Sequence, residues 1–155
     1  MAKILLQPDF KDLLRLLNSN RVEYLVVGGY AVGYFGYPRA TGDLDIWVAV
    51  NPANARKIVA ALDGFGIPQE GLAPDIFLEK DKIIRIGNPP LRVEIITGAS
   101  GVTFSDCFNR RVLADAGDMT INLISRDDLL TNKKAAGRHK DLEDCHQLQS
   151  KKKTH

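Results

Sequence analysis

The chain has 155 residues, of which 45% are hydrophobic and 26% are charged, and its formal net charge is only +2. This length favours one domain with a buried core, and the low net charge excludes a general attraction to nucleic acid or to anionic membranes. We therefore expect one domain over residues 1–150, followed by a basic C-terminal tail, residues 151–155, that is disordered.

The first half of the chain alternates between helical and strand patterns. Apolar residues recur at helical spacing from Phe10 to Leu17, which predicts a helix that begins at Pro8-Asp9. Asn51 before Pro52 is typical of a helix start, and this second long helix is expected to stop at Gly64. Two strands are predicted over 22–27 and 44–48, with a short helix over 30–35.

The second half predicts short strands and two further helices. A loop that contains several Gly and Pro residues is expected over 64–75. Ser125, followed by Asp128, is a capping-box pattern that opens a helix, and a last helix covers about 140–148. Short strands are predicted over 82–86, 91–96, 111–113 and 119–124, the first two as a hairpin. Together these elements predict a mixed α/β (α+β) fold, with one mixed β-sheet and flanking helices in a single domain.

Two aspartates lie in a predicted strand that alternates between acidic and apolar residues. Because strand side chains alternate, Leu44 and Ile46 are expected on the core face, and Asp43 and Asp45 on the other face. Two ionised carboxylates about 5 Å apart repel by roughly 3 kcal/mol at an effective dielectric of about 20. A divalent cation between them reverses this sign, and Mg²⁺ prefers carboxylate oxygens. The alternative is a strand whose two Asp side chains are merely solvated.

A third carboxylate occupies a later predicted strand. Glu94 separates Val93 from Ile95, so it faces away from the core together with Arg92. If this strand lies beside the one that carries the two aspartates, three carboxylates converge, as a metal site for phosphoryl transfer requires. The alternative is an ordinary exposed glutamate.

A glycine pair separates the first predicted strand from the short helix. Gly28 and Gly29 would let the backbone approach a phosphate closely, next to the free N–H groups of a helix start. Arg39 and Thr41, on the loop that enters the second strand, are candidate contacts for a triphosphate. The alternatives are a tight strand–helix turn without a ligand and ordinary solvation of the loop.

Taken together, these motifs resemble the DNA polymerase β-type nucleotidyltransferase superfamily. Its pattern is a strand ending in Gly-Gly or Gly-Ser, an Asp-x-Asp or Asp-x-Glu motif on the next strand, and a later strand carboxylate. Here Gly28-Gly29, Asp43-Leu44-Asp45 and Glu94 match this pattern, and the resemblance covers about residues 22–97. Members often carry Asp at the third position. Glu94 is one methylene longer, so its carboxylate reaches further than that of an Asp into a site where magnesium demands octahedral geometry.

The resemblance implies a role for each matching residue. Asp43 and Asp45 would hold both metal ions, which are Mg²⁺ or Mn²⁺. Glu94 would complete the metal site that activates the acceptor hydroxyl, and would take the proton of that hydroxyl. Gly28 and Gly29 would cradle the triphosphate of an NTP substrate.

Within the superfamily, the chain resembles most the small prokaryotic nucleotidyltransferases of the abortive-infection and toxin–antitoxin type. This closer resemblance rests on two segments, residues 24–45 and residues 133–142. It implies that Lys133 reaches the phosphates or the acceptor. Three further residues either form a polar network near the site or brace the last helices: Arg138, Asp141 and Asp144.

The implied reaction moves a nucleoside monophosphate from an NTP to a hydroxyl of tRNA or of a protein, within a toxin–antitoxin or phage-defence system. Two alternatives stay open: a catalytically inactive binding module that acts as an antitoxin-like or toxin-like partner, and an antibiotic-modifying nucleotidyltransferase. A homo-oligomer is compatible with so short a chain. Two cysteines and the lack of a membrane-length apolar stretch lead us to expect a cytoplasmic protein without a membrane partner.

Overall fold

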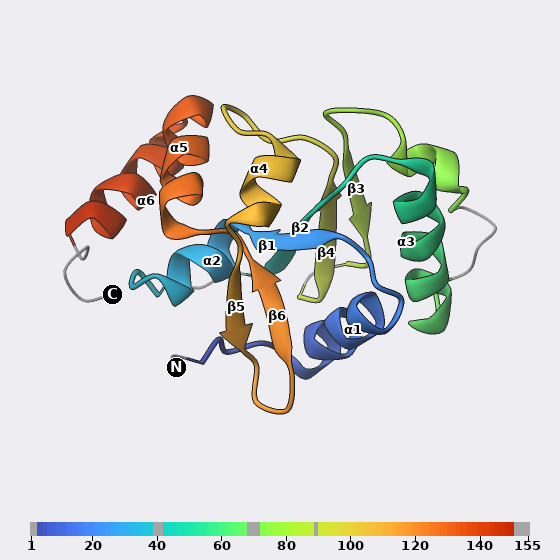
Figure 1. Ribbon diagram of the computed structural model, residues 1–155. Coiled ribbons are helices and arrows are strands. Elements are labelled where there is room, and N and C mark those ends of the chain that lie inside the picture. The colour runs from blue at the N-terminus through green and yellow to red at the C-terminus, as the bar shows by residue number, and fades with distance from the viewer. Residues whose placement is uncertain (1–2, 39–41, 68–71, 89, 151–155) are drawn as a thin grey trace.

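A six-stranded mixed β-sheet forms the centre of the molecule (Figure 1). The computed structural model describes residues 3–38, 42–67, 72–88 and 90–150, so the expected tail at 151–155 lies outside the described residues. The strand order is β3-β4-β2-β1-β6-β5. The strands are β1 (Tyr24–Val27), β2 (Asp43–Val48), β3 (Ile83–Ile86), β4 (Arg92–Ile96), β5 (Val112–Asp115) and β6 (Thr120–Leu123).

Two pairs of neighbouring strands run parallel and the other three run antiparallel. β2 is parallel to β4, and β1 is parallel to β6. The β1–β2, β3–β4 and β5–β6 pairs are antiparallel. β1 lies in the interior of the sheet, and all four of its residues are buried. The predicted fold class, a single mixed α/β domain with flanking helices, is confirmed.

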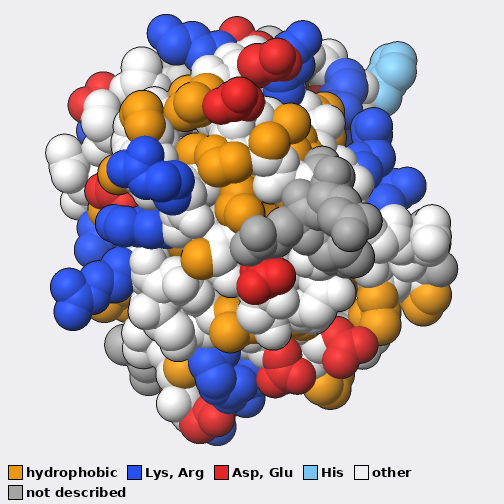
Figure 2. Space-filling view, turned by 90° about the vertical axis from the view of Figure 1, so that its right-hand side faces the viewer, with side chains coloured by type: hydrophobic (Ala, Val, Ile, Leu, Met, Phe, Trp, Pro, Cys, Tyr) orange, Lys and Arg blue, Asp and Glu red, His pale blue; other side chains and the backbone are white. Residues whose placement is uncertain are grey.

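The four long helices of the described residues lie at opposite ends of the molecule. Figure 1 shows α1 and α3 at one end and α5 and α6 at the other. Figure 2 looks onto the α3 end, where basic and acidic groups surround hydrophobic side chains, so neither sign of charge dominates this face. The helices are α1 (Pro8–Ser19), α2 (Gly28–Tyr34), α3 (Pro52–Gly64), α4 (Phe104–Asn109), α5 (Arg126–Ala136) and α6 (His139–Ser150), with a 3-10 turn, η2 (Pro74–Phe77). Within the described ranges, no helix combines the length and apolar character needed to cross a membrane.

The buried faces of α1 and α3 follow the predicted spacing. All four apolar residues of α1 that recur from Phe10 to Leu17 are buried. Asn51 caps α3, because its side chain accepts a hydrogen bond from the N–H of Asn54. The buried Asn54 side chain in turn accepts from the N–H of Glu23 at 2.8 Å and donates to the carbonyl of Ala49 at 2.9 Å. These bonds attach the start of α3 to the loop before β1 and to the end of β2.

Some predicted boundaries were wrong by a few residues. The first strand begins at Tyr24, so the predicted range 22–27 was too long. The helix predicted over 30–35 begins at Gly28, so the glycine pair forms its first turn instead of a separate turn before it. α4 was not predicted, because a helix of only 6 residues is too short to show a helical repeat.

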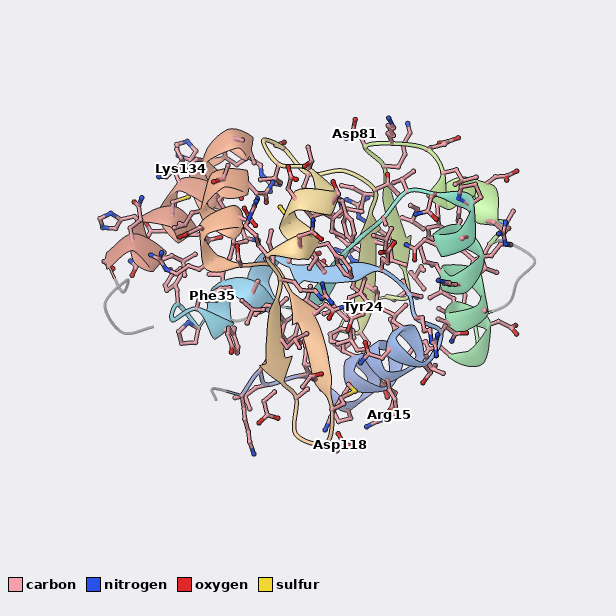
Figure 3. All side chains as sticks on the ribbon, viewed as in Figure 1. Arg15, Tyr24, Phe35, Asp81, Asp118 and Lys134 are labelled. Carbon is pink, nitrogen blue, oxygen red and sulfur yellow. The ribbon has the colours of Figure 1, made fainter. Side chains whose placement is uncertain are left out.

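A cluster of ion pairs holds α1 against the tip of the β5–β6 hairpin. Arg15 and Asp118 mark this contact in Figure 3, and their closest atoms, Nη2 and Oδ2, are 2.8 Å apart. Lys11 Nζ lies 2.9 Å from the other carboxylate oxygen of Asp118. Hydrogen bonds from Lys11 and Arg15 lower the pKa of Asp118 to about 2, so this exposed contact stays intact at all ordinary pH values.

Candidate active site

The pairing of β2 with β4 brings the predicted carboxylates to one place. In this parallel pair, Asp45 lies opposite Glu94 and Asp43 lies opposite Arg92. Leu44, between the two aspartates, is fully buried, while the aspartates on either side are half-buried on the opposite face. β4 therefore lies beside β2, as convergence of the three carboxylates requires.

The three carboxylates line one cavity of about 720 Å³. Gly28 and Gly29 form part of its wall at the start of α2, and Lys133 reaches it from α5. Six predicted site residues thus line the same cavity: Gly28, Gly29, Asp43, Asp45, Glu94 and Lys133. The other two, Arg39 and Thr41, lie outside the described residues.

Gly28 is in direct contact with Asp45, which explains why the position needs a glycine. Its backbone has a φ of +68°, a conformation that residues with a Cβ rarely adopt. A Cβ at this position would lie 2.8 Å from Cγ of Asp45 and would overlap the carboxylate. The role of Gly28 in phosphate binding stays a prediction, and the contact with Asp45 is a separate, intramolecular reason for a glycine here.

The surroundings of Asp45 strongly perturb its ionisation. Burial, together with the negative charges of Glu94 and Asp43, raises the pKa of Asp45 to about 7. Lys133 and Lys140 act in the opposite direction but do not compensate. Without an added cation, the surroundings of Asp45 therefore disfavour its ionised form.

Two arginines lie against the carboxylates, and the sequence analysis did not assign them to the site. Arg92 Nη2 donates to Oδ2 of Asp43 at 2.8 Å and lies 3.7 Å from Oε1 of Glu94. Arg85, opposite Glu94 in the β3–β4 pair, donates to the same Oε1 at 3.2 Å. The available signal was the two-residue period, which places Arg92 and Glu94 on one face of their strand.

The donor set fits a hard divalent cation, but two of its carboxylates, those of Asp43 and Glu94, contact arginines. Asp43, Asp45 and Glu94 offer carboxylate oxygens from adjacent strands, which suits Mg²⁺ or Mn²⁺. Across the described part of the chain, however, no group of three or more His, Cys, Asp or Glu side chains is already arranged around a metal position. A metal ion bound by Asp43 Oδ2 or Glu94 Oε1 would replace an arginine contact at that oxygen.

A buried ion-pair network joins α5 to α6 at the side of the cavity. Lys133 Nζ lies 3.2 Å from Oδ1 of Asp141 and 3.1 Å from Oδ2 of Asp144, and all three side chains are buried. Arg138 Nε donates to Asp141 at 2.7 Å. Although burial raises the pKa of Asp141, hydrogen bonds from Arg138 and Lys133 hold it below its ordinary value. These residues brace the two helices, and all of them except Asp144 also line the cavity.

The loop after β4 supplies a wall of the cavity that the sequence analysis missed. Gly98, Ala99 and Ser100 line the cavity together with Asn132 of α5. The side chain of Asn132 donates to the carbonyl of Ser100 at 3.0 Å, which fixes the loop against the helix. No motif indicated this contact, because it joins residues that are far apart in the sequence.

Trp47, although it follows the aspartates on β2, is not part of this cavity. It is buried, and its ring meets that of Phe104 edge-to-face with centroids 5.3 Å apart. An aromatic residue at this position of the strand could stack on a nucleobase or cover the sheet, and the packing of Trp47 supports covering the sheet.

Comparison with known proteins relates the fold to solved structures. No protein-family model matches the sequence, and no curated protein matches it. A Thermotoga maritima protein provisionally assigned as a nucleotidyltransferase matches with a TM-score of 0.56 and 13% identity, over 97% of each chain. The chain has a nucleotidyltransferase-like fold. An antigenic nucleotidyltransferase-like protein from Paracoccidioides brasiliensis matches with a TM-score of 0.47 and 17% identity, over 90% of this chain and 74% of the other.

Proposed function

We propose that the chain is a metal-dependent nucleotidyltransferase, which moves a nucleoside monophosphate from an NTP to a hydroxyl acceptor and releases pyrophosphate. One observation carries this proposal: the parallel pairing of β2 with β4 places Asp45 opposite Glu94, with Asp43 on the same side of the cavity. Three carboxylates in one cavity with a nucleotidyltransferase-like fold match the donor set that phosphoryl transfer uses.

In this proposal, Asp43, Asp45 and Glu94 would hold Mg²⁺ or Mn²⁺, and the ion would supply positive charge to stabilise the transferred phosphoryl group. The acceptor oxygen forms a bond to the α-phosphorus, and the bond from that phosphorus to the bridging oxygen of the pyrophosphate group breaks. The proton of the acceptor hydroxyl passes to the Glu94 carboxylate. Positioning of the two reactants accounts for much of the rate in reactions of this kind.

Basic side chains on the far wall of the cavity complement the triphosphate. Lys133, Arg138 and Lys140 line the cavity opposite the strands that carry the carboxylates. Lys133 is held by two buried aspartates, so it offers a fixed charge, whereas the Arg138 side chain is 76% exposed while it pairs with Asp141. Gly28 and Gly29 present backbone without side chains to the same space.

The proposed acceptor is a hydroxyl of tRNA or of a partner protein, within a toxin–antitoxin or phage-defence system in the cytoplasm. An antibiotic hydroxyl is the alternative acceptor. We propose that a partner protein or a second copy contributes part of the acceptor surface.

A binding module without turnover is the second candidate, and the arginine contacts favour it. Asp43 and Glu94 both contact guanidinium groups in the structure, which neutralises them without a metal. A protein that has lost catalysis while keeping its fold would keep such pairs. Under this reading, a stable complex with a partner protein would survive the substitution Asp43→Ala.

Calorimetry of NTP binding with and without Mg²⁺ tests the first proposal. Wild-type protein is expected to bind an NTP only when Mg²⁺ is present, and the Asp43→Ala/Asp45→Ala double variant is expected to bind none. Circular dichroism checks that the variant is folded. If wild type binds, radiolabelled NTP then reports transfer to tRNA, protein and antibiotic acceptors. Absence of any NTP binding by the wild type would contradict the enzyme proposal and favour the binding module.

A further inference from the structure

Two arginines lie beside the three carboxylates, and one of them, Arg85, also lines the cavity. Arg92 and Arg85 both contact the carboxylate cluster, and each comes from a strand position that pairs directly with an acidic residue. Arg92 pairs in register with Asp43, and Arg85 pairs in register with Glu94. The backbone of the sheet therefore holds one arginine beside each of these two acids.

Arg92 occupies the space between two of the proposed metal ligands. Its Nη2 atom lies 2.8 Å from Asp43 Oδ2 and 3.7 Å from Glu94 Oε1. A metal ion bound by Asp43 Oδ2 and Glu94 Oε1 would lie between these two oxygens, since Mg²⁺ binds oxygen at about 2.1 Å. Nη2 and the ion therefore compete for one place.

The Nε atom of Arg92 shows that the hydrogen bonding of this guanidinium is incomplete. Its Nε is buried and has no hydrogen-bond partner within the part of the chain that the structure describes. A buried donor without a partner is costly, so this position is less favourable for the guanidinium than a fully hydrogen-bonded one. Such a group can leave when a stronger cation takes over the carboxylate.

We propose that Arg92 is a built-in counter-cation that holds Asp43 in the metal-free protein and must leave it when a divalent ion binds. This inference rests on the proposed function for the identity of the metal site. It makes the Arg92–Asp43 ion pair and the bound metal mutually exclusive. Arg92 is thus a positioning residue that stabilises the metal-free site and raises the metal concentration at which the site fills.

Binding of Mn²⁺ alone to the full chain, measured by the loss of the free-ion electron paramagnetic resonance signal, tests the proposal. Arg92→Gln is expected to bind Mn²⁺ at least about fivefold more tightly than wild type, because a half-buried charge beside the ion is removed. Arg92→Lys keeps the charge and is expected to stay close to wild type. Arg56→Gln, an exposed charge change on α3 outside the cavity, is the control for net charge.

Thermal unfolding supplies a readout that does not depend on affinity. In EDTA, Arg92→Gln is expected to unfold at a lower temperature than wild type, because the ion pair between the Arg92 guanidinium and Asp43 is lost. At saturating Mn²⁺ this difference is expected to disappear or to change sign, since the ion takes over the role of the guanidinium. An arginine with a purely structural role would give the same difference in both conditions, and that result would overturn the proposal.

The outcomes separate this inference from the proposed function. If wild type binds Mn²⁺, Asp45→Asn does not, and Arg92→Gln is no tighter than wild type, then the inference fails while the metal site stands. If only Arg92→Gln binds Mn²⁺, the inference is supported and the wild-type chain is not a metal-dependent enzyme. If no variant binds Mn²⁺, both the inference and the metal site are wrong.

Discussion

At the scale of single residues, the surroundings of Asp45 constrain both its charge and the space around it. Its side chain lies in the space that a Cβ of Gly28 would fill, and it faces Glu94 across the strand pair. Burial and neighbouring acids raise the pKa of Asp45 to about 7, so its ionised form is disfavoured in the folded metal-free protein. Two predictions follow from this environment, one about charge and one about space.

Asp45→Asn is expected to stabilise the metal-free fold at high pH. Because the folded-state pKa of about 7 lies above the ordinary value of 3.8, ionised Asp45 costs stability, and this cost grows as pH rises from 3.8 towards 7. At about 1.4 kcal/mol per pKa unit, the gain at pH 8 is at most about 4 kcal/mol. Urea unfolding in EDTA at pH 4 and pH 8 measures this gain in the free energy of unfolding. A gain that does not increase with pH would contradict the raised pKa of Asp45.

Gly28→Ala is expected to destabilise the fold by about 2 kcal/mol or more, because it adds a Cβ where the Asp45 carboxylate lies and forces a positive φ on alanine. Gly42→Ala is the matched control, since a Cβ at this other cavity glycine meets no atom within 4 Å. Urea unfolding compares the two variants with wild type. Equal stability of both variants would show that the contact with Asp45 does not require glycine.

At the scale of secondary-structure elements, the ion-pair network between α5 and α6 forms one side of the cavity. Lys133 is buried between Asp141 and Asp144, and its charge is the one that both acids share. Removing one member of a buried network leaves uncompensated charge, which costs more than the network contributes when intact. A single substitution in this network is therefore expected to lower the stability of the fold and to change one side of the cavity.

Lys133→Met is expected to destabilise the fold by about 3 kcal/mol, because Asp144 and Asp141 stay buried without their shared cation. Lys134→Met is the matched control. Lys134, labelled in Figure 3, is the next residue of α5 and is exposed, so its loss should change stability by less than about 0.5 kcal/mol. Urea unfolding at neutral pH measures both variants. Similar losses in the two would mean that the buried network contributes no special stability.

At the scale of the whole molecule, the cavity joins the sheet, α2, the loop after β4 and the α5–α6 pair. A ligand that contacts all of these parts binds only the folded chain, so it stabilises the folded state as a whole. The proposed substrate is such a ligand, because its triphosphate would lie between the strand carboxylates and the basic residues of α5 and α6.

Mg²⁺ together with NTP is expected to raise the thermal unfolding temperature of wild type. At a ligand concentration of 100 times the Kd, binding adds about 2.7 kcal/mol of stability. The Asp43→Ala/Asp45→Ala variant is expected to show no increase, and neither Mg²⁺-free NTP nor Mg²⁺ alone should match the combined effect. A shift of the same size in the double variant would mean that the nucleotide binds elsewhere.

The sequence by itself determined the local elements and the candidate residues. Helical repeats, caps and strand alternation depend only on neighbours along the chain, so α1, α3 and the faces of β2 and β4 were predictable. The tertiary structure alone decided that β4 lies beside β2, that Gly28 makes room for Asp45, and that Arg92 rests against Asp43. These contacts join residues far apart in the chain, and their strand register is fixed by packing of the whole sheet, which no local pattern records.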